Sequence, residues 1–239
     1  MAPMIYWKMI SFFGRLLDLI SPRQCSICGC RLAASEQVLC AVCNLTLPRT
    51  GFADDAYDNE MARLFWGRLP IERAAALFYY ERGSQTTQVI FDLKYRNHPE
   101  IGEQLGYFMA EELSEKGFFD GIDLIIPVPL TRKRQRQRGY NQSTAIAHGI
   151  QNAVSLPVKE HILHRNRYHG SQTEMSRWQR ADNVEGAFSL YDADAIRDKH
   201  LLIVDDVVTT GATVCTCGKE LMKAGGIRIS VLSLGYSKA

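Results

Sequence analysis

The sequence predicts an α/β fold: an open, mostly parallel sheet with helices on both faces, preceded by a small cysteine-rich module. Apolar runs such as 123–129 and 200–206 lack the strict alternation of a half-exposed strand, so both faces of these strands should be covered. Helix-like segments alternate with these runs along the chain, as in a parallel sheet. Two CxxC pairs near the N-terminus indicate the separate module.

The expected elements follow from apolar periodicity and from the positions of glycine and proline. We expect strands at 71–80, 123–129, near 158–163, at 187–191, at 200–206 and at 227–236, and helices at 85–96, from Pro99 to about Lys116, at 141–153 and at 211–224. We expect an N-terminal helix and four-cysteine zinc module over 1–50, a connector and leading strand over 51–84, and the main domain over 85–239.

Composition sets broad limits on function. The chain has 239 residues, 46% of them apolar and 23% charged, which is ordinary for a globular protein with one core and a small module. The net charge of +2 is nearly neutral, so any evidence for nucleic-acid binding must come from local clusters of charge.

The first residues have the spacing of an amphipathic helix, with apolar side chains at Trp7, Ile10, Phe13, Leu17 and Ile20. Charged residues interrupt this segment at Lys8, Arg15 and Asp18, so no run approaches the roughly 18 to 20 residues of a membrane span. There is no cleavage site of the kind that follows a secretory signal. We therefore expect no membrane span and a cytoplasmic location.

The cysteines fall into two groups, and their total of 7 argues against a complete set of disulfides. The pairs Cys25/Cys28 and Cys40/Cys43 have the spacing of two zinc knuckles, so we predict a structural Zn²⁺ site. Cys30 is a spare thiol that competes as a ligand. Reduced thiols or a redox pair are the alternative interpretation. Cys215 and Cys217 are expected to be packing residues.

The segment LLIVDDVVTTGAT, residues 201–213, is the most informative part of the chain. Its apolar strand leads to Asp205 and Asp206, whose carboxylates accept hydrogen bonds from paired ribose hydroxyls and can also bind Mg²⁺. A glycine turn and the start of a helix follow, which offer free N–H groups to a phosphate. The candidate phosphate-binding residues are Thr209, Thr210, Gly211, Ala212 and Thr213. This order predicts a ribose-5-phosphate cradle, against the alternative of simple turn and helix caps.

A second anion-binding candidate is the loop expected over 127–143. It carries five cations within seven residues: Arg132, Lys133, Arg134, Arg136 and Arg138. Arginine suits bidentate contacts with phosphate oxygens, so this loop could neutralise a pyrophosphate. A solvated basic turn is one alternative. A nucleic-acid contact, with Tyr140 as a stacking partner, is another.

The segment around Asp205 resembles the motif by which phosphoribosyltransferases bind phosphoribosyl pyrophosphate (PRPP). The RGYNQ stretch (138–142) and the polar segment 164–188 resemble the ComF/GntX branch, a competence-associated, amidophosphoribosyltransferase-type group. The resemblance covers nearly the whole chain. It implies a type I phosphoribosyltransferase-like fold in which Asp205 and Asp206 contact ribose hydroxyls, 209–213 bind the 5-phosphate, and the basic loop binds pyrophosphate.

The same resemblance assigns segment 164–188 to a mobile loop, with Gln172, Arg180 and Asn183 as its matching residues. His169 stands where the family pattern has Thr, which leaves the detailed chemistry of this loop open. Lys94 and Tyr95 also match a family stretch, although a solvated helix face explains them as well.

Three hypotheses for function follow. The first is a phosphoribosyltransferase, hence a glycosyltransferase, that binds PRPP with Mg²⁺ and releases pyrophosphate; no base-reading hood is recognisable after the last strand. The second, implied by the resemblance, is an accessory factor for natural transformation that handles single-stranded DNA with a competence helicase and binds a nucleotide without turning it over. The third is a regulator that senses PRPP and passes the signal to a partner through the zinc module. The acceptor and the oligomeric state are left open.

Overall fold

The protein, described here from a computed structural model, forms two compact units, Met1–Leu47 and Pro48–Ala239. The structure describes residues 22–81, 83–166 and 186–238. The N-terminal amphipathic helix expected before residue 21 lies outside these ranges. The domain boundaries expected at residues 50 and 84 remain predictions.

The first unit is organised around its cysteines. Cys25, Leu32, Cys40 and Cys43 form its buried cluster, and Ile27 and Leu39 pack against it. An isolated bridge between Gln24 and Arg31 closes the first turn, and the helix α2 (Ala41–Thr46) follows the second cysteine pair. So small an apolar cluster contributes little hydrophobic stabilisation on its own.

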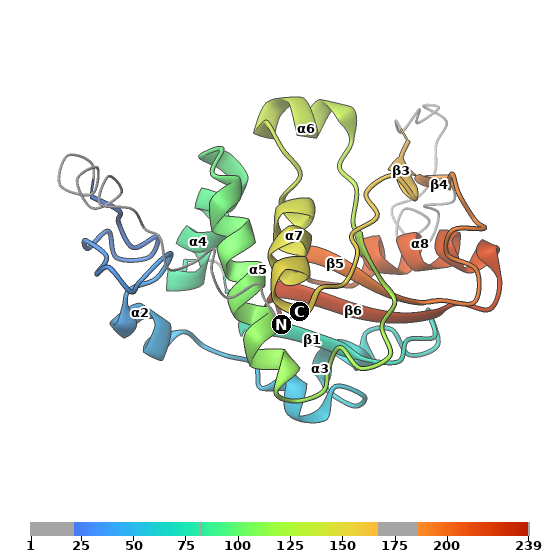
Figure 1. Ribbon diagram of the computed structural model, residues 1–239, viewed down its shortest axis with the longest axis horizontal. Helices are drawn as coiled ribbons and strands as arrows, with labels where there is room; N and C mark the ends of the chain where they lie inside the picture. Colours follow the sequence, from blue (N-terminus) through green and yellow to red (C-terminus); the bar gives the residue numbers. More distant parts are fainter. Residues whose placement is uncertain (1–21, 82, 167–185, 239) are drawn as a thin grey trace, which may run out of the picture. The chain divides into compact units, whose positions relative to one another are not determined.

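The second unit is built on a parallel sheet with the strand order β1-β6-β5-β2 (Figure 1). The strands are β1 (Ala74–Tyr79), β2 (Leu124–Pro127), β5 (His200–Val208) and β6 (Arg228–Tyr236). All three pairings are parallel, and Asp205 lies opposite Ser233 in the register of β5 with β6. The predicted parallel sheet is confirmed.

A separate antiparallel ribbon pairs β3 (Leu163–Arg165) with β4 (Phe188–Leu190). The sequence predicts strands in both regions but gives no sign that they form a sheet of their own. In β5 and β6, residues 201–204, Val231, Leu232 and Leu234 are fully buried, as expected for strands covered on both faces.

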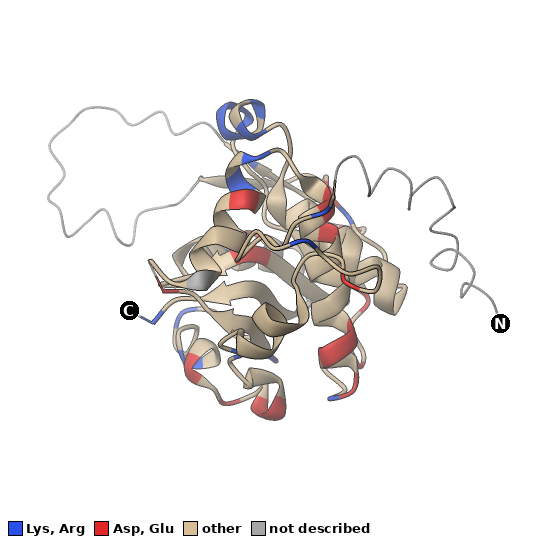
Figure 2. Ribbon diagram, turned by 90° about the vertical axis from the view of Figure 1, so that its left-hand side faces the viewer, with Lys and Arg blue, Asp and Glu red and all other residues tan. Residues whose placement is uncertain are grey.

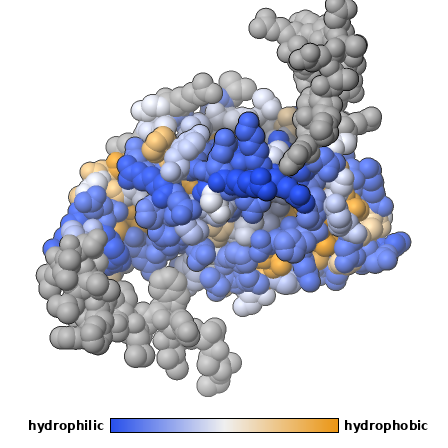
Figure 3. Space-filling view, turned by 90° about the horizontal axis from the view of Figure 1, so that it is seen from above, coloured by the Kyte–Doolittle hydropathy of each residue, from blue (hydrophilic) through white to orange (hydrophobic). Residues whose placement is uncertain are grey.

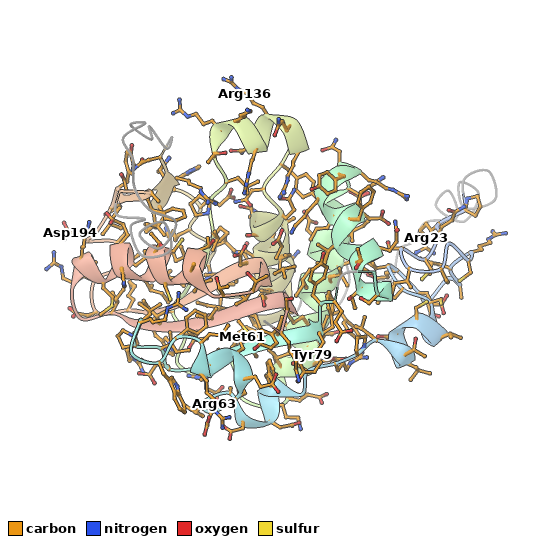
Figure 4. All side chains as sticks on the ribbon, turned by 180° about the vertical axis from the view of Figure 1, so that it is seen from behind. Arg23, Met61, Arg63, Tyr79, Arg136 and Asp194 are labelled. Carbon is orange, nitrogen blue, oxygen red and sulfur yellow. The ribbon has the colours of Figure 1, made fainter. Side chains whose placement is uncertain are left out.

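Helices cover both faces of the sheet. The helices α5 (Pro99–Ser114) and α7 (Gln142–Val154) lie on the face toward the viewer in Figure 1, whereas α8 (Ala212–Leu221) and α3 (Glu60–Arg63) lie on the opposite face, seen in Figure 4. The helix α4 (Gln85–Tyr95) packs against α5, and a short 3-10 turn, η2 (Met222–Ala224), follows α8. None of the helices in the described part of the chain has the length and apolar character needed to cross a membrane.

Glycines bring α5 and α7 into close backbone contact. A Cβ atom on Gly106 would lie 2.2 Å from the carbonyl oxygen of Ile146, and one on Gly149 would lie 1.9 Å from the carbonyl oxygen of Glu103. Side chains at these positions would force the helices apart, so the glycines fix the distance at which α7 lies from α5.

The expected connector, 51–70, packs into the core of the second unit. It contains a 3-10 helix, η1 (Phe52–Asp55), and α3, whose cap Asn59 accepts hydrogen bonds from Met61 N and Ala62 N. Phe65 and Leu69 are buried, and a Cβ atom on Gly218 of α8 would lie 2.4 Å from Leu69 Cδ2. This segment therefore packs against α8, the helix that follows the cradle.

The basic loop expected after β2 is instead a helix, α6 (Arg132–Arg138). Thr131 caps its start, with its Oγ1 accepting a hydrogen bond from Arg134 N at 3.3 Å. Gly139, at φ 82°, ends it. The prediction of a loop was wrong because the arginines, lysine and glutamines between these caps are good helix formers.

Candidate functional site

The cradle lies where β5 ends and α8 begins. A small pocket here is lined by Asp205 and by 207–214, so the structure brings together Asp205 and all five candidate phosphate-binding residues. Asp206 points elsewhere, toward α4. The site is thus built from a single continuous segment of the chain, at the carboxyl end of a central strand, where ligands of parallel sheets bind.

Asp205 is partly buried and held by two hydrogen bonds to its Oδ1 atom. The hydroxyl of Ser143, at the start of α7, donates at 3.2 Å, and the backbone N–H of Asp206 donates at 2.9 Å. Burial, together with the neighbouring Asp206 carboxylate, raises the pKa of Asp205 to about 7. A hydroxyl donor or a cation placed beside this carboxyl would stabilise its ionised form and lower its pKa.

Asp206 forms an ion pair with Lys94 of α4, at 3.1 Å between Nζ and Oδ2. The two side chains are only 22% and 14% exposed, so Lys94 belongs to the site and is not part of a solvated helix face. Such a sheltered pair is less screened by salt than a surface pair. Lys94 therefore brings a cation next to the cradle.

Two residues that the sequence analysis missed hold the turn with the candidate phosphate-binding residues in place. Gly211 has φ 70°, and a Cβ atom there would lie 3.0 Å from Phe65 Cε1. Arg68 donates through Nη1 to the carbonyl oxygen of Thr210 at 2.7 Å. Both partners lie in the expected connector, whose weak pattern carried no signal of a role at the site.

The cations of α6 do not line this pocket. Arg132, Lys133, Arg134 and Arg136 are exposed, and no carboxylate pairs with any of them within the described ranges. The helix is blue along its length at the top of Figure 2, and Arg136 points away from the sheet in Figure 4. Arg138 differs: it donates to Gln142 Oε1 at 2.8 Å and lies 5.7 Å from the ring centroid of Tyr95. The candidate mobile-loop residues Gln172, Arg180 and Asn183 lie outside the described residues.

A second candidate site is the cysteine cluster of the first unit. The sulfur atoms of Cys25, Cys28, Cys30 and Cys40 all lie within 4.8 Å of one another, close enough for one metal ion. Two backbone N–H groups point at sulfur: Cys40 N donates to Cys25 Sγ and Cys43 N donates to Cys40 Sγ, each at 3.4 Å. Such bonds favour thiolates, the form in which cysteine binds zinc.

The cluster differs by one residue from the predicted ligand set. It contains Cys30, treated as a spare thiol in the sequence analysis, in place of Cys43, which lies in the first turn of α2. Cys43 is nevertheless close: burial and the side chains of Cys28, Cys40 and Cys25 raise its pKa. Four thiols therefore lie close enough together for one ion, with Cys43 as their neighbour, and this donor set fits Zn²⁺.

Comparison with known families agrees with this geometry. Residues 102–235 match the model of the phosphoribosyl transferase domain, which covers the sheet from β2 to β6 and the cradle. This match spans more than half of the chain. The chain belongs to the phosphoribosyl transferase domain family and has its type I fold.

Within that family the chain is a ComF-family, phosphoribosyltransferase-like protein. It is 27% identical over 213 residues to the DNA utilization protein YhgH of Escherichia coli O157:H7, covering 88% of each chain. It is 34% identical over 113 residues to competence protein F of Haemophilus influenzae, covering 47% of this chain and 49% of that protein. Competence protein ComFC of Bacillus subtilis is 23% identical over 146 residues, which are 61% of this chain and 57% of that protein.

Solved structures are more distant. Glutamine PRPP amidotransferase from B. subtilis, in complex with ADP and GMP, is 21% identical, with a TM-score of 0.40. The match covers 59% of this chain but only 30% of the amidotransferase chain. At this distance we transfer no residue or ligand from that enzyme.

Proposed function

We propose that the protein binds PRPP at the cradle formed by β5 and the start of α8. The observation that supports this most directly is that Asp205 and 207–214 line one pocket at the end of a buried parallel strand. Paired carboxylates, a glycine turn and a helix start are the groups that a ribose 5-phosphate requires.

In this proposal the chain's own groups hold the ligand. The carboxylates of Asp205 and Asp206 accept hydrogen bonds from the ribose hydroxyls, and the amides and hydroxyls of 209–213 bind the 5-phosphate. Asp206 is paired with Lys94 in this structure, so it would have to turn away from that partner to reach the ribose. Mg²⁺, when bound with PRPP, neutralises pyrophosphate charge. If an acceptor is present, its nucleophile attacks the anomeric carbon as the bond to pyrophosphate breaks, and the pair of electrons leaves with pyrophosphate.

Calorimetric titration tests this assignment. PRPP with Mg²⁺ should bind the wild type and should bind an Asp205→Asn, Asp206→Asn double variant at least about 100-fold more weakly, because the ribose loses both charged acceptors. Asp194→Asn, at an exposed position outside the lining of the cradle, is the control for a loss of negative charge. Equal affinities of wild type and double variant would refute the site. Pyrophosphate release across a panel of bases then separates a transferase from a binding protein.

A second proposed function is the handling of single-stranded DNA. Two relatives carry the names DNA utilization protein and competence protein, and the unpaired cations of α6 offer contacts for phosphates. Binding of this kind weakens as salt is raised, since phosphate contacts release counterions. Affinity for an oligonucleotide that does not change between low and moderate salt would argue against this function. A helicase partner and a cytoplasmic location belong to the same proposal.

We also propose that the cysteine cluster holds a structural Zn²⁺. Metal analysis of the purified protein should give about one zinc per chain, and removal of zinc should unfold the first unit, since its apolar cluster is small. Single Cys30→Ser and Cys43→Ser variants identify the fourth ligand. The variant that no longer binds zinc is the one in which the ligand has been replaced. A protein that contains no zinc and melts unchanged with a chelator would contradict the proposal.

A further inference from the structure

A second and larger cavity lies beside α6. Its volume is about 460 Å³, and none of its lining residues lines the cradle. It is formed by the starts of α5 and α7, by α6 and by the segment that leads through β3. The side chains used below are Arg132, His148, Glu160, His161, His164 and Arg165.

The cavity presents two guanidinium groups. Arg132 is exposed, and no hydrogen bond or ion pair engages its guanidinium in the described part of the chain. Arg165 is half-buried, and its guanidinium lies 5.3 Å from the ring centroid of Phe188 without a carboxylate partner in the same ranges. Burial and the nearby Arg134 lower the pKa of Arg165, against smaller opposing effects of Cys217 and Asp205. Two unpaired arginines that face one cavity favour an anion, and a phosphate suits them best.

The lining also holds two carboxylates, Glu103 and Glu160, and neither forms an ion pair with Arg132 or Arg165 in the described part of the chain. Glu160 is paired with His148, whose Nε2 lies 3.1 Å from its Oε1. Glu103, on α5, is the other carboxylate of the lining. Further positive charge beside the cavity comes from three cations of α6 that form no ion pair in the described structure: Lys133, Arg134 and Arg136. Figure 3, seen from the side on which α6 lies in Figure 1, shows strongly hydrophilic residues across this face.

One wall of the cavity continues into a series of rings. The rings of His161 and His164 are stacked, with centroids 6.2 Å apart and an interplanar angle of 24°. Tyr191, which follows β4, extends the series with its centroid 4.2 Å from that of His164. The Tyr191 side chain is 70% exposed. An exposed aromatic series beside cations offers stacking faces for nucleobases.

We propose that this cavity binds single-stranded DNA, with backbone phosphates at Arg132 and Arg165 and bases stacked along His161, His164 and Tyr191. The inference rests on the DNA-handling function proposed above and deepens it by naming the site. A single strand fits because its unpaired bases expose the ring faces that a duplex buries. A free nucleotide carries the same chemistry, so the test distinguishes the two sources.

The experiment is fluorescence anisotropy with a labelled 20-nucleotide oligo(dT). Arg132→Gln, Arg165→Gln and Tyr191→Ala should each weaken binding about tenfold, since each removes one phosphate or stacking contact. Arg228→Gln removes the same charge from an exposed position at the start of β6, outside α6 and outside the cavity lining, so its effect should stay within about threefold. Tyr191→Phe keeps the ring and should bind as the wild type does. Should Arg165→Gln fold poorly, the exposed Tyr191 and Arg132 variants decide.

The outcomes separate the site from the function. If the wild type does not bind the oligonucleotide, both the DNA-handling function and this site fail. If it binds but the cavity variants match Arg228→Gln, the cavity is refuted while DNA handling stands. Displacement by dTMP at the same nucleotide concentration would assign the cavity to free nucleotides and overturn the proposal. An Asp205→Asn variant that loses PRPP but keeps oligonucleotide affinity supports two independent sites.

Discussion

The segments after β5 and after β2 leave the same edge of the sheet from neighbouring strands, yet they are held in different ways. After β5, each part of the turn has a partner: Lys94 at Asp206, Arg68 at Thr210 and Phe65 at Gly211. After β2, α6 places cations in solvent with few partners. Contacts within the fold fix the position of the first segment, whereas the second presents charge to solvent with little geometric constraint.

The largest effect should follow from a methyl group at Gly211. Gly211→Ala places a side chain at φ 70° and 3.0 Å from Phe65, so we expect a loss of about 2 kcal/mol in the free energy of unfolding and at least tenfold weaker PRPP binding. Urea denaturation and calorimetry measure the two effects. Gly121→Ala is the control, since Gly121 has φ 73° and open space around it. If both variants lose equal stability and affinity, the turn is not held as described.

A smaller effect concerns the charge of Asp205. Its pKa of about 7 in the fold lies above the ordinary value of 3.8, so between these pH values the folded state keeps a proton that the unfolded chain has lost. This carboxyl therefore costs stability increasingly as the pH rises through that window. Asp205→Asn should match the wild type near pH 4 and exceed its stability by on the order of 1 kcal/mol at pH 8. A stability difference that is the same at both pH values would contradict the raised pKa of this carboxyl.

The smallest effect should come from α6. Arg134→Gln and Arg136→Gln remove exposed cations that have no ion pair in the described structure, so the free energy of unfolding should change by no more than about 0.5 kcal/mol. Urea denaturation at two salt concentrations measures it. A loss above about 1 kcal/mol in either variant would show that α6 has structural partners, as the β5 turn does.

Local patterns in the sequence identify most of the sheet and the central part of the cradle. Buried strands appear as continuous apolar runs, and the order of acids, threonines and glycine after 201–204 predicts residues gathered at one strand end, where Asp205 and 207–214 line one pocket. These signals depend on residues that are neighbours in the chain, so they can be recognised from the sequence alone. The assignment of α6 as a loop failed because five cations were read as charge alone, while the caps Thr131 and Gly139 carried the helical signal.

The remaining parts depend on contacts between distant residues. Arg68 reaches Thr210 across 142 positions, and nothing in the composition of 51–70 marks it. The pairing of β3 with β4 likewise joins segments separated by residues that carry no register signal. The exchange of Cys30 for Cys43 arises from the three-dimensional path of the module, because spacing alone favours two regular pairs.

The glycine contact between α5 and α7 has a consequence for genetic work on this protein. Ser143, which bonds to Asp205, stands on α7, and α7 is held in position through Gly106 and Gly149. A Gly149→Ala allele would alter no group that touches a ligand, yet it would loosen the seating of that hydroxyl. We expect such an allele to be temperature-sensitive: the protein would function in cells at low temperature and lose its function on warming.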